Sequence, residues 1–169
     1  MTSFSVEPFD RRSHDRSDFE CGVPALDRYL KRQLGQDVRR RVAAAYVLVT
    51  GDDRIVRGYY TLSASGLPRE LFAPEVAAKL PPYEEIPLAR IGRLAVDRRL
   101  HGQGVGGALL SDAVRRAISS GIGLAGVLVD AKDDAAVSFY EHFGFRSLRT
   151  RRRTLVLAID SSLEKRLAD

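Results

Sequence analysis

The sequence predicts an α/β or α+β protein with a central sheet and a βαβ unit in its C-terminal half. Segments of strand-like composition alternate with segments whose apolar residues recur at a helical period. A glycine-rich turn separates one of these strands from a helix beyond the middle of the chain. The length, 169 residues, is enough for one hydrophobic core and too short for two domains of ordinary size. We therefore expect a single domain over residues 1–169.

The N-terminal half of the chain predicts a strand, a helix and a β-hairpin. In the helix, apolar residues from Leu26 to Val38 fall near a helical period, Pro24 suits a first turn, and Gly35 is a weak position. The two strands that follow are rich in β-branched and aromatic residues and are separated by a turn sequence. In order, the predicted elements are the strand Phe4–Phe9, the helix Pro24–Arg41, the strand Ala43–Thr50, the turn Gly51–Arg54 and the strand Ile55–Ser63.

The C-terminal half alternates helices and strands. Three prolines, Pro81, Pro82 and Pro87, predict an irregular loop, because proline cannot extend a helix or a central strand. The helix after the glycine-rich turn has an apolar stripe opposite a polar face that includes Asp112. In order, the predicted elements are the short helix Arg69–Leu80, the strand Leu88–Val96, the helix through Leu109–Ile118, the strand Leu124–Val129, the helix Asp133–Phe143 ended by Gly144, and the strand Leu155–Ile159.

Composition excludes several classes of protein. No apolar run approaches the ~20 residues that span a bilayer, and the first residues lack a signal-peptide pattern, so a cytoplasmic protein is expected. The single cysteine, Cys21, excludes an internal disulfide and a cysteine-based metal site, and we expect no metal. The formal net charge is +5, and only four of the cationic residues are lysines. Arginine suits nucleic-acid or CoA phosphates, although a GC-rich coding sequence also raises the ratio of arginine to lysine.

The glycine-rich turn lies within Leu94–Leu110, with glycines at positions 102, 104, 106 and 107 between an apolar strand and an amphipathic helix. Glycine lets backbone N–H groups approach a ligand closely, and the N–H groups at a helix N-terminus are unpaired, which suits a phosphate. Two other phosphate-binding motifs fit poorly. No Gly-Lys-Ser/Thr follows, as a P-loop requires, and the turn does not follow the first strand, as a dinucleotide fold requires.

Two motifs in this half resemble those of the GNAT acetyltransferase superfamily. The family pattern Gln/Arg-x-x-Gly-x-Gly/Ala corresponds to residues 101–106, with His101 in place of glutamine or arginine. Ala136–Phe145 contains the FYxxxGF signature of the last helix of the family. The resemblance implies the GNAT acyl-CoA N-acyltransferase fold, a mixed central sheet of about six to seven strands flanked by helices.

The rest of the chain resembles the GNAT toxins of type II toxin–antitoxin systems, from about residue 4 to residue 160. The motifs that carry this resemblance are Phe19–Gly22, Leu26–Leu30, Gly58–Ser63, Leu80–Tyr83 and Gly92–Asp97. It implies an acetyl-CoA-dependent N-acetyltransferase that acetylates the α-amine of aminoacyl-tRNA and halts translation. It also implies a cognate antitoxin, a small DNA-binding dimer whose disordered tail covers the active site, and a toxin that is itself a homodimer.

The resemblance also assigns roles at the acetyl-CoA site. Backbone groups of the strand before the turn are expected to bind the pantetheine arm and to polarise the thioester carbonyl. The N–H groups of Gln103 to Gly107 are expected to hold the pyrophosphate. The expected cofactor-binding residues are Leu94, Ala95, Val96, His101, Gly102, Gln103, Gly104, Val105, Gly106, Gly107 and Phe139.

Tyr140 is the predicted general acid, because a tyrosine with its ordinary pKa near ~10 can protonate the departing thiolate. The alternative is that Phe139 and Tyr140 only pack the helix on the sheet; their position within FYxxxGF favours catalysis. No general base stands out, and His14, His101 and His142 are expected to be surface or structural residues. The acceptor needs none, since about a tenth of an α-amine with a pKa near ~8 is deprotonated, and therefore nucleophilic, at pH ~7.

Three groups of arginines are predicted to bind tRNA. Arginine runs are ordinarily solvated surface, but three groups around one predicted active site argue against coincidence. Arg93 alternates with Leu94, so one of the two is expected to point away from the sheet toward the acceptor. The predicted tRNA-binding residues are Arg39, Arg40 and Arg41 after the second helix, Arg90 and Arg93 flanking the fourth strand, and Arg149, Arg151, Arg152 and Arg153 in a run, begun by Arg146, without an acid.

Two other functions remain open from the sequence. One is a GNAT enzyme that acetylates a small amine, a peptide or a protein N-terminus, with the same fold and cofactor. The other is not enzymatic: a CoA-binding subunit that joins an antitoxin on operator DNA. An intact Tyr140 and the glycines of the turn favour catalysis over the second.

Overall fold

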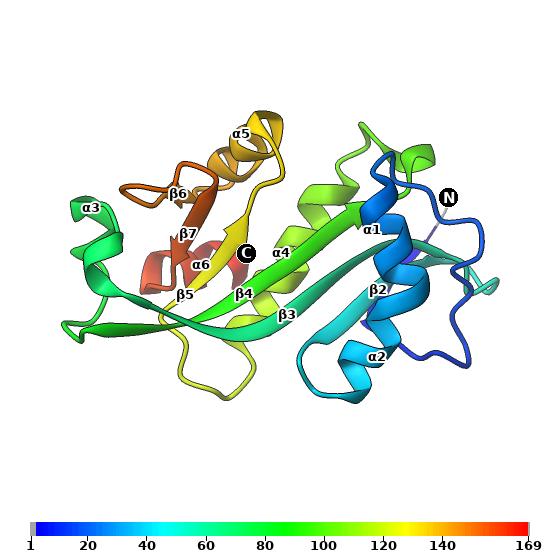
Figure 1. Cartoon of the computed structure of the whole chain (residues 1–169), viewed down its shortest axis with the longest axis horizontal. Coiled ribbons are helices and arrows are strands. Elements are labelled where there is room, and N and C mark those ends of the chain that lie inside the picture. The colour runs from blue at the N-terminus through cyan, green and yellow to red at the C-terminus, as the bar shows by residue number, and fades with distance from the viewer. Residues whose placement is uncertain (1–2, 169) are drawn as a thin grey trace. The chain divides into compact units, whose positions relative to one another are not determined.

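The computed structural model describes residues 3–168, which form a seven-stranded mixed sheet with flanking helices (Figure 1). The strand order is β1-β2-β3-β4-β5-β7-β6. The strands are β1 Phe4–Pro8, β2 Ala44–Thr50, β3 Val56–Pro68, β4 Glu85–Val96, β5 Gly126–Asp130, β6 Arg146–Ser147 and β7 Thr154–Ala158. The helices are α1 Pro24–Arg28, the π-helix η1 Tyr29–Gln33, α2 Leu34–Arg39, the 3-10 helix η2 Arg69–Leu71, α3 Pro74–Ala77, the 3-10 helix η3 Arg98–Leu100, α4 Val105–Ile118, α5 Asp134–His142 and α6 Ser161–Ala168.

This sheet confirms the predicted fold class. The predicted βαβ unit is also present, because β4 and β5 are joined through α4 and pair in parallel from Leu88–Gly126 to Ile91–Val129. The described residues divide into two compact units, one from residues 3–63 and 92–113, the other from residues 64–91 and 114–168. The prediction of one domain for the whole chain stays a prediction. No helix within residues 3–168 is long and apolar enough to cross a membrane.

In the first unit, β1, β2 and β3 pair antiparallel. Val47 and Val49 of β2 and Tyr59 of β3 lie in one buried cluster with Leu30 and Leu34 of the helical segment. Alternate residues of a strand point to opposite faces of the sheet. Because Tyr59 faces the helical segment, its neighbour Gly58 lies on the opposite face, which packs against α4. A Cβ at Gly58 would lie 2.9 Å from Cδ1 of Leu109, so a larger residue at this position would have to displace that side chain of α4.

A β-bulge interrupts the pairing of β2 with β3. Leu48 pairs with Gly58 and Val49 with Val56, which leaves Arg57 as the extra residue on β3. A bulge of this kind changes the direction of the side chain that it carries. The side chain of Arg57 therefore does not follow the regular alternation between the two faces of the sheet. Its guanidinium lies beside Asp97, the residue after β4.

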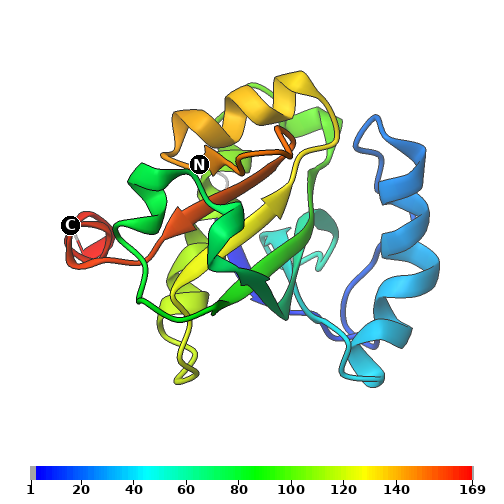
Figure 2. The ribbon, with the colours of Figure 1, turned by 60° about the vertical axis from the view of Figure 1, so that its left-hand side comes forward.

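The predicted helix Pro24–Arg41 is one continuous helical segment made of α1, η1 and α2, visible in Figures 1 and 2. Pro24 begins it, as predicted. Two details differ from the prediction. Its middle turn is a π-helix, and it ends at Arg39 because Arg41 takes a left-handed conformation with φ 61°.

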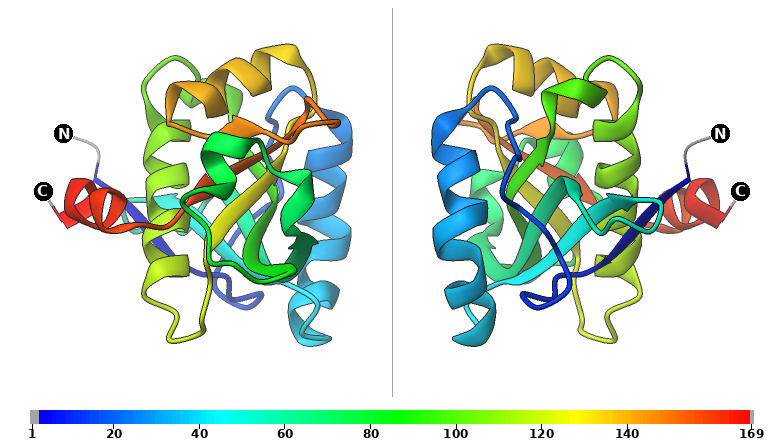
Figure 3. Two further views of the ribbon diagram at one scale, coloured as in Figure 1. Left: turned by 90° about the vertical axis from the view of Figure 1, so that its left-hand side faces the viewer. Right: turned by 90° about the vertical axis from the view of Figure 1, so that its right-hand side faces the viewer.

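The second unit contains the parallel pair of β4 with β5 and the antiparallel pairs of β5 with β7 and of β6 with β7. Its buried cluster joins β4, β5 and β7 to Phe72 and to Val76 of α3. Figure 3 shows α5, in yellow to orange, and the strands β6 and β7 that follow it. Asp133 caps α5 by accepting from the N–H of Ala136 at 2.8 Å, and Gly144 ends the helix with φ 95°, as predicted.

Several predictions for this half were wrong. The loop predicted up to Pro87 is shorter, because β4 begins at Glu85 and contains that proline. Proline lacks only the N–H donor, and the carbonyl of Pro87 still accepts from Ala125 at 2.8 Å. The helix predicted over Arg69–Leu80 is two short turns, since Pro74 starts a new helix after an extended Ala73. β3 extends to Pro68, and the sequence did not predict β6 or α6.

Candidate functional site

The glycine-rich turn lies between η3 and α4 in the first unit. Gly102 and Gly104 have φ of 76° and 77°, the left-handed region that favours glycine. A Cβ built at either residue would meet no other atom of the described chain within 4 Å. In α4 the carbonyl of Gly104 accepts from Ala108, so the N–H groups of the preceding residues have no acceptor within the helix. The turn therefore presents several N–H groups and the positive end of a fourteen-residue helix to an anion.

His101, the residue that departs from the family pattern, faces its own chain. Its Nε2 lies 2.8 Å from the carbonyl oxygen of Val96. Because a carbonyl only accepts, Nε2 carries the proton and donates it. The side chain thus ties the start of the turn to the end of β4, which is a structural role for this exposed histidine. His14 is also structural, since its two ring nitrogens contact Glu7 at 2.6 Å and the N–H of Asp10 at 2.8 Å.

The end of β4 has one paired and one unpaired edge. Pairing of β4 with β5 stops at Ile91 and Val129. The N–H of Arg93 donates to Thr61, and the N–H of Asp97 donates to the carbonyl of Arg57 at 2.8 Å, which holds the β3 side. Over residues 92–96, the other edge therefore has no strand partner within the described chain. Such an edge can pair with an extended ligand through its backbone groups.

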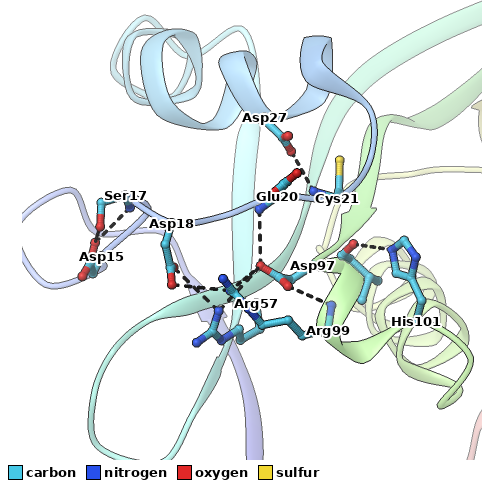
Figure 4. Close-up of polar contacts among 11 residues, drawn as sticks. Asp15, Ser17, Asp18, Glu20, Cys21, Asp27, Arg57, Asp97, Arg99 and His101 are labelled. Atoms are coloured by element: carbon cyan, nitrogen blue, oxygen red, sulfur yellow. Dashed lines mark hydrogen bonds and ion pairs between the residues drawn. The ribbon is translucent and has the colours of Figure 1, made fainter.

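Asp97, which no prediction singled out, lies between this strand end and the turn. Its side chain is completely buried. It accepts from the N–H of Arg99 at 3.0 Å, from the N–H of Glu20 at 3.3 Å and from the guanidinium of Arg99 at 3.1 Å (Figure 4). The guanidinium of Arg57 lies 3.6 Å away. The sequence offers one signal for this residue, an acid directly after an apolar strand. That signal does not reveal its contact with Glu20, which lies 77 positions earlier.

Tyr140 belongs to α5 in the second unit. Its ring is buried, with Phe139 edge-on at 5.2 Å and Phe145 at 5.7 Å between ring centroids. The packing role considered for this pair is therefore real, and it leaves the hydroxyl without a hydrogen-bond partner within residues 3–168. Burial, aided by the negative charge of Asp130, raises the pKa of Tyr140 to about 12. The phenol is thus neutral at physiological pH and free to donate to a ligand.

In the first unit, one predicted tRNA-binding arginine has a fixed position. Arg93 is exposed and its guanidinium lies 3.6 Å from the ring centroid of Tyr29, so it is the member of the Arg93–Leu94 pair that points outward. The hydroxyl of Tyr29 donates to Asp37 at 2.7 Å. Burial first, and this hydrogen bond second, raise the pKa of Tyr29 to about 12. Arg93 thus rests on the helical segment that ends at the exposed Arg39 and is followed by the exposed Arg40 and Arg41.

In the second unit, several predicted arginines have acidic partners. Arg90 pairs with Asp130, and Arg152 and Arg153 lie 3.2 and 3.5 Å from Asp134. Two details of the prediction are corrected. Arg90 and Arg93 lie inside β4 rather than flanking it, and the run of arginines that lacks an acid in sequence finds acids in space, Glu75 included, at 3.1 Å from Arg146. Arg149 and Arg151 are exposed and have no acidic partner among the residues that the structure describes.

Comparison with known proteins agrees with these features. A family model described as an acetyltransferase (GNAT) domain matches residues 78–154. The tRNA-acetylating toxin of Mycobacterium tuberculosis is 38% identical over 149 residues, which cover 86% of each chain.

Two solved structures match almost the whole chain. One is AtaT complexed with acetyl-methionyl-tRNAfMet, with 31% identity, a TM-score of 0.85, and coverage of 99% of this chain and 100% of the other. The other is an AtaT toxin with a tyrosine-to-phenylalanine substitution, bound to the C-terminus of the antitoxin AtaR and acetyl-CoA. It has 28% identity, a TM-score of 0.83, and coverage of 98% and 99%.

Proposed function

This chain belongs to the GNAT acetyltransferase family, and we propose that it transfers the acetyl group of acetyl-CoA to the α-amine of aminoacyl-tRNA. The observation that carries this proposal is the 38% identity, over 86% of both chains, to a tRNA-acetylating toxin. The AtaT complex with an acetylated initiator tRNA supports the same acceptor. In this role the protein is a toxin that acts in the cytoplasm, where it blocks translation.

The residues of the turn fit the acetyl donor. Pyrophosphate is expected to lie on the N–H groups of Gln103 to Gly107, where neither Gly102 nor Gly104 places a Cβ. The pantetheine arm is expected to pair with the open backbone edge of Leu94–Val96. Acetyl-CoA supplies the activated acyl group. Phe139 keeps its predicted place in the cofactor set, and His101 contributes by tying Val96 to the turn.

The acceptor side is proposed to be held by arginines. Guanidinium groups bind phosphate oxygens in a bidentate manner, and Arg93 is fixed over Tyr29 with its cation exposed. Arg149 and Arg151, which have no acidic partner within residues 3–168, are the strongest candidates in the second unit. No side chain is required as a base, because about a tenth of an α-amine with a pKa near ~8 already carries a free lone pair at pH ~7.

We further propose that a cognate antitoxin neutralises the protein. The AtaT structure with the C-terminus of AtaR supports an antitoxin tail as the partner, and the resemblance implies that the antitoxin also binds DNA. Homodimerisation is proposed on the same resemblance.

Acetylation of total tRNA tests the acceptor. With radiolabelled acetyl-CoA, label is expected in charged tRNA and not in deacylated tRNA. Label in a small amine or a peptide N-terminus, with none in charged tRNA, would support the alternative GNAT enzyme. Growth arrest on expression, relieved by Tyr140→Phe, is expected only of an enzyme; arrest that persists in this variant would favour the non-enzymatic CoA-binding subunit.

Gly104→Ala is expected to weaken acetyl-CoA binding as well as stability. The left-handed φ of 77° costs an alanine roughly 1–2 kcal/mol, and the new Cβ points into the open space where the pyrophosphate is expected. Calorimetric titration with acetyl-CoA and thermal unfolding measure the two effects. Gly121→Ala is the matched control, because Gly121 has φ 79° and equally open surroundings outside the turn. Equal affinity of the two variants for acetyl-CoA would contradict the placement of the pyrophosphate.

A further inference from the structure

Asp97 connects three segments of the first unit through one buried carboxylate. It is the last residue before η3, and Oδ1 accepts from the N–H of Arg99, as a cap does. Oδ2 accepts from the N–H of Glu20, which leads into the helical segment. In return, the carbonyl of Glu20 accepts from the N–H of Arg98 at 2.9 Å. The end of β4, the start of the turn and the N-terminal segment are therefore fixed to one another (Figure 4).

The charge of Asp97 is compensated by two arginines. Burial of an unpaired carboxylate is costly, so a side chain with no exposed surface requires compensation. Arg99 lies 3.1 Å from Oδ2, and Arg57, brought there by the β-bulge, lies 3.6 Å from the same atom. The buried Nη1 of Arg57 has no hydrogen-bond partner among the described residues, so its contribution is one of charge. The directional contacts of Asp97 are those to the two backbone N–H groups and to Arg99.

The residues that follow Asp97 are held at a second point. The ring of His101 donates to the carbonyl of Val96, directly before Asp97. The segment 97–101 is thus held by hydrogen bonds to Val96 and to Glu20, directly before Gly102 and Gly104. These contacts set the direction in which the turn and the first N–H groups of α4 face.

We propose that Asp97 is a positioning residue for acetyl-CoA: it fixes the start of the glycine turn, so that the N–H groups of residues 103–107 are already oriented for the pyrophosphate. Preorganised groups avoid the cost of ordering a loop on binding, which appears directly as affinity. The inference rests on the proposed use of acetyl-CoA, and it concerns the donor alone, whatever the acceptor is.

The test compares two acetyl donors in the Asp97→Asn variant. An amide NH2 replaces one acceptor oxygen and faces an N–H donor, which removes a charge-assisted hydrogen bond. The Kd for acetyl-CoA is expected to rise about tenfold. With S-acetylpantetheine, which lacks the pyrophosphate, kcat/KM is expected to stay within about twofold of wild type, because the turn makes no contact to that donor. A loss of folding alone would lower activity with both donors.

Asp18→Asn is the matched control. Asp18 lies 3.6 Å from Arg57 and 3.4 Å from Arg99, the same two arginines, but it is half exposed. It accepts from neither backbone N–H group, so its replacement is expected to leave both donors unaffected. An Asp97→Asn variant that binds acetyl-CoA as wild type does, or that loses both donors equally, would overturn the proposal. A wild type that binds no acetyl-CoA would instead refute the proposed function.

Hydrogen exchange on the wild-type protein gives a readout that needs no variant. The amides of Glu20 and Arg99 are expected to be protected before acetyl-CoA is added and to change little afterwards. Fast exchange that becomes slow only on binding would show that the turn is not preorganised, and would overturn the inference. If Asp97→Asn does not fold, Asp97→Glu keeps the charge but displaces the carboxylate, and the same difference between donors is expected.

Discussion

Replacement of Tyr140 by phenylalanine is expected to lower kcat about 100-fold while the Kd for acetyl-CoA stays nearly unchanged. The ring is held by Phe139 and Phe145, and the variant keeps these contacts. Only the hydroxyl is lost, and it has no partner within residues 3–168. Steady-state acetylation of charged tRNA and calorimetric titration with acetyl-CoA measure the two quantities. Tyr83→Phe, the same change at an exposed tyrosine, is the control, and a kcat for Tyr140→Phe equal to that of this control would refute the assignment.

The raised pKa refines the role proposed for this phenol. A tyrosine with a pKa of about 12 remains protonated at every pH of interest. Complete transfer of its proton to a thiolate, whose conjugate acid has a pKa near ~8.5, is unfavourable by roughly 3 to 4 pKa units. Tyr140 is therefore proposed to keep its proton and to stabilise the developing negative charge as a hydrogen-bond donor, while the departing thiolate takes its proton from the ammonium group that forms when the amine attacks. The sequence, which offers only the ordinary pKa of tyrosine, could not predict this.

The pH dependence of kcat/KM follows from the same values. Activity is expected to rise with pH as the acceptor α-amine loses its proton near pH ~8. It should not fall again until the pH approaches the pKa of Tyr140, about 12, because the phenol keeps its proton below that value. A rate profile of wild type over the range in which the protein is folded checks this. A descending limb close to neutrality, absent in Tyr140→Phe, would contradict the raised pKa.

The parts of the site that the sequence predicted are local. Glycines between a strand and a helix allow a tight turn and leave the N–H groups of the helix start accessible, whatever the rest of the fold. The turn at residues 101–107 could therefore be predicted without tertiary information. Asp97 was missed because what defines it, burial and contact with Glu20, depends on segments 77 residues apart. The bulge at Arg57 and the π-helix at Tyr29–Gln33 likewise arise from packing and have no distinct local pattern.

For the arginines, the sequence predicted too many unpaired charges, because it does not show which distant acidic residues lie beside them in the fold. A run without a neighbouring acid in sequence predicted five free cations, but Asp134, the first residue of α5, approaches Arg152 and Arg153. Glu75 does the same for Arg146. Charge counted along the chain overstates the charge available to a ligand, because folding brings distant carboxylates to the same surface.

The double variant Arg149→Glu/Arg151→Glu is expected to raise the KM for charged tRNA about 100-fold and to spare acetyl-CoA binding. Each arginine is proposed to make one charge-assisted contact to phosphate, worth about tenfold when lost. Arg152→Glu is expected to have a smaller effect, since Asp134 already neutralises part of its charge. Acetylation of charged tRNA at several tRNA concentrations measures the KM of each variant.

Salt dependence separates contact with phosphate from a general effect of charge. Loss of two phosphate contacts is expected to reduce the slope of log affinity against log salt by about two. Arg115→Glu/Arg166→Glu lowers the net charge by the same amount at two exposed positions on α4 and α6, outside the predicted set. This control is expected to keep the wild-type slope, because it changes only the long-range field, which salt screens. Equal loss of tRNA affinity in both double variants would mean that net charge, rather than a surface around Arg149 and Arg151, attracts the tRNA.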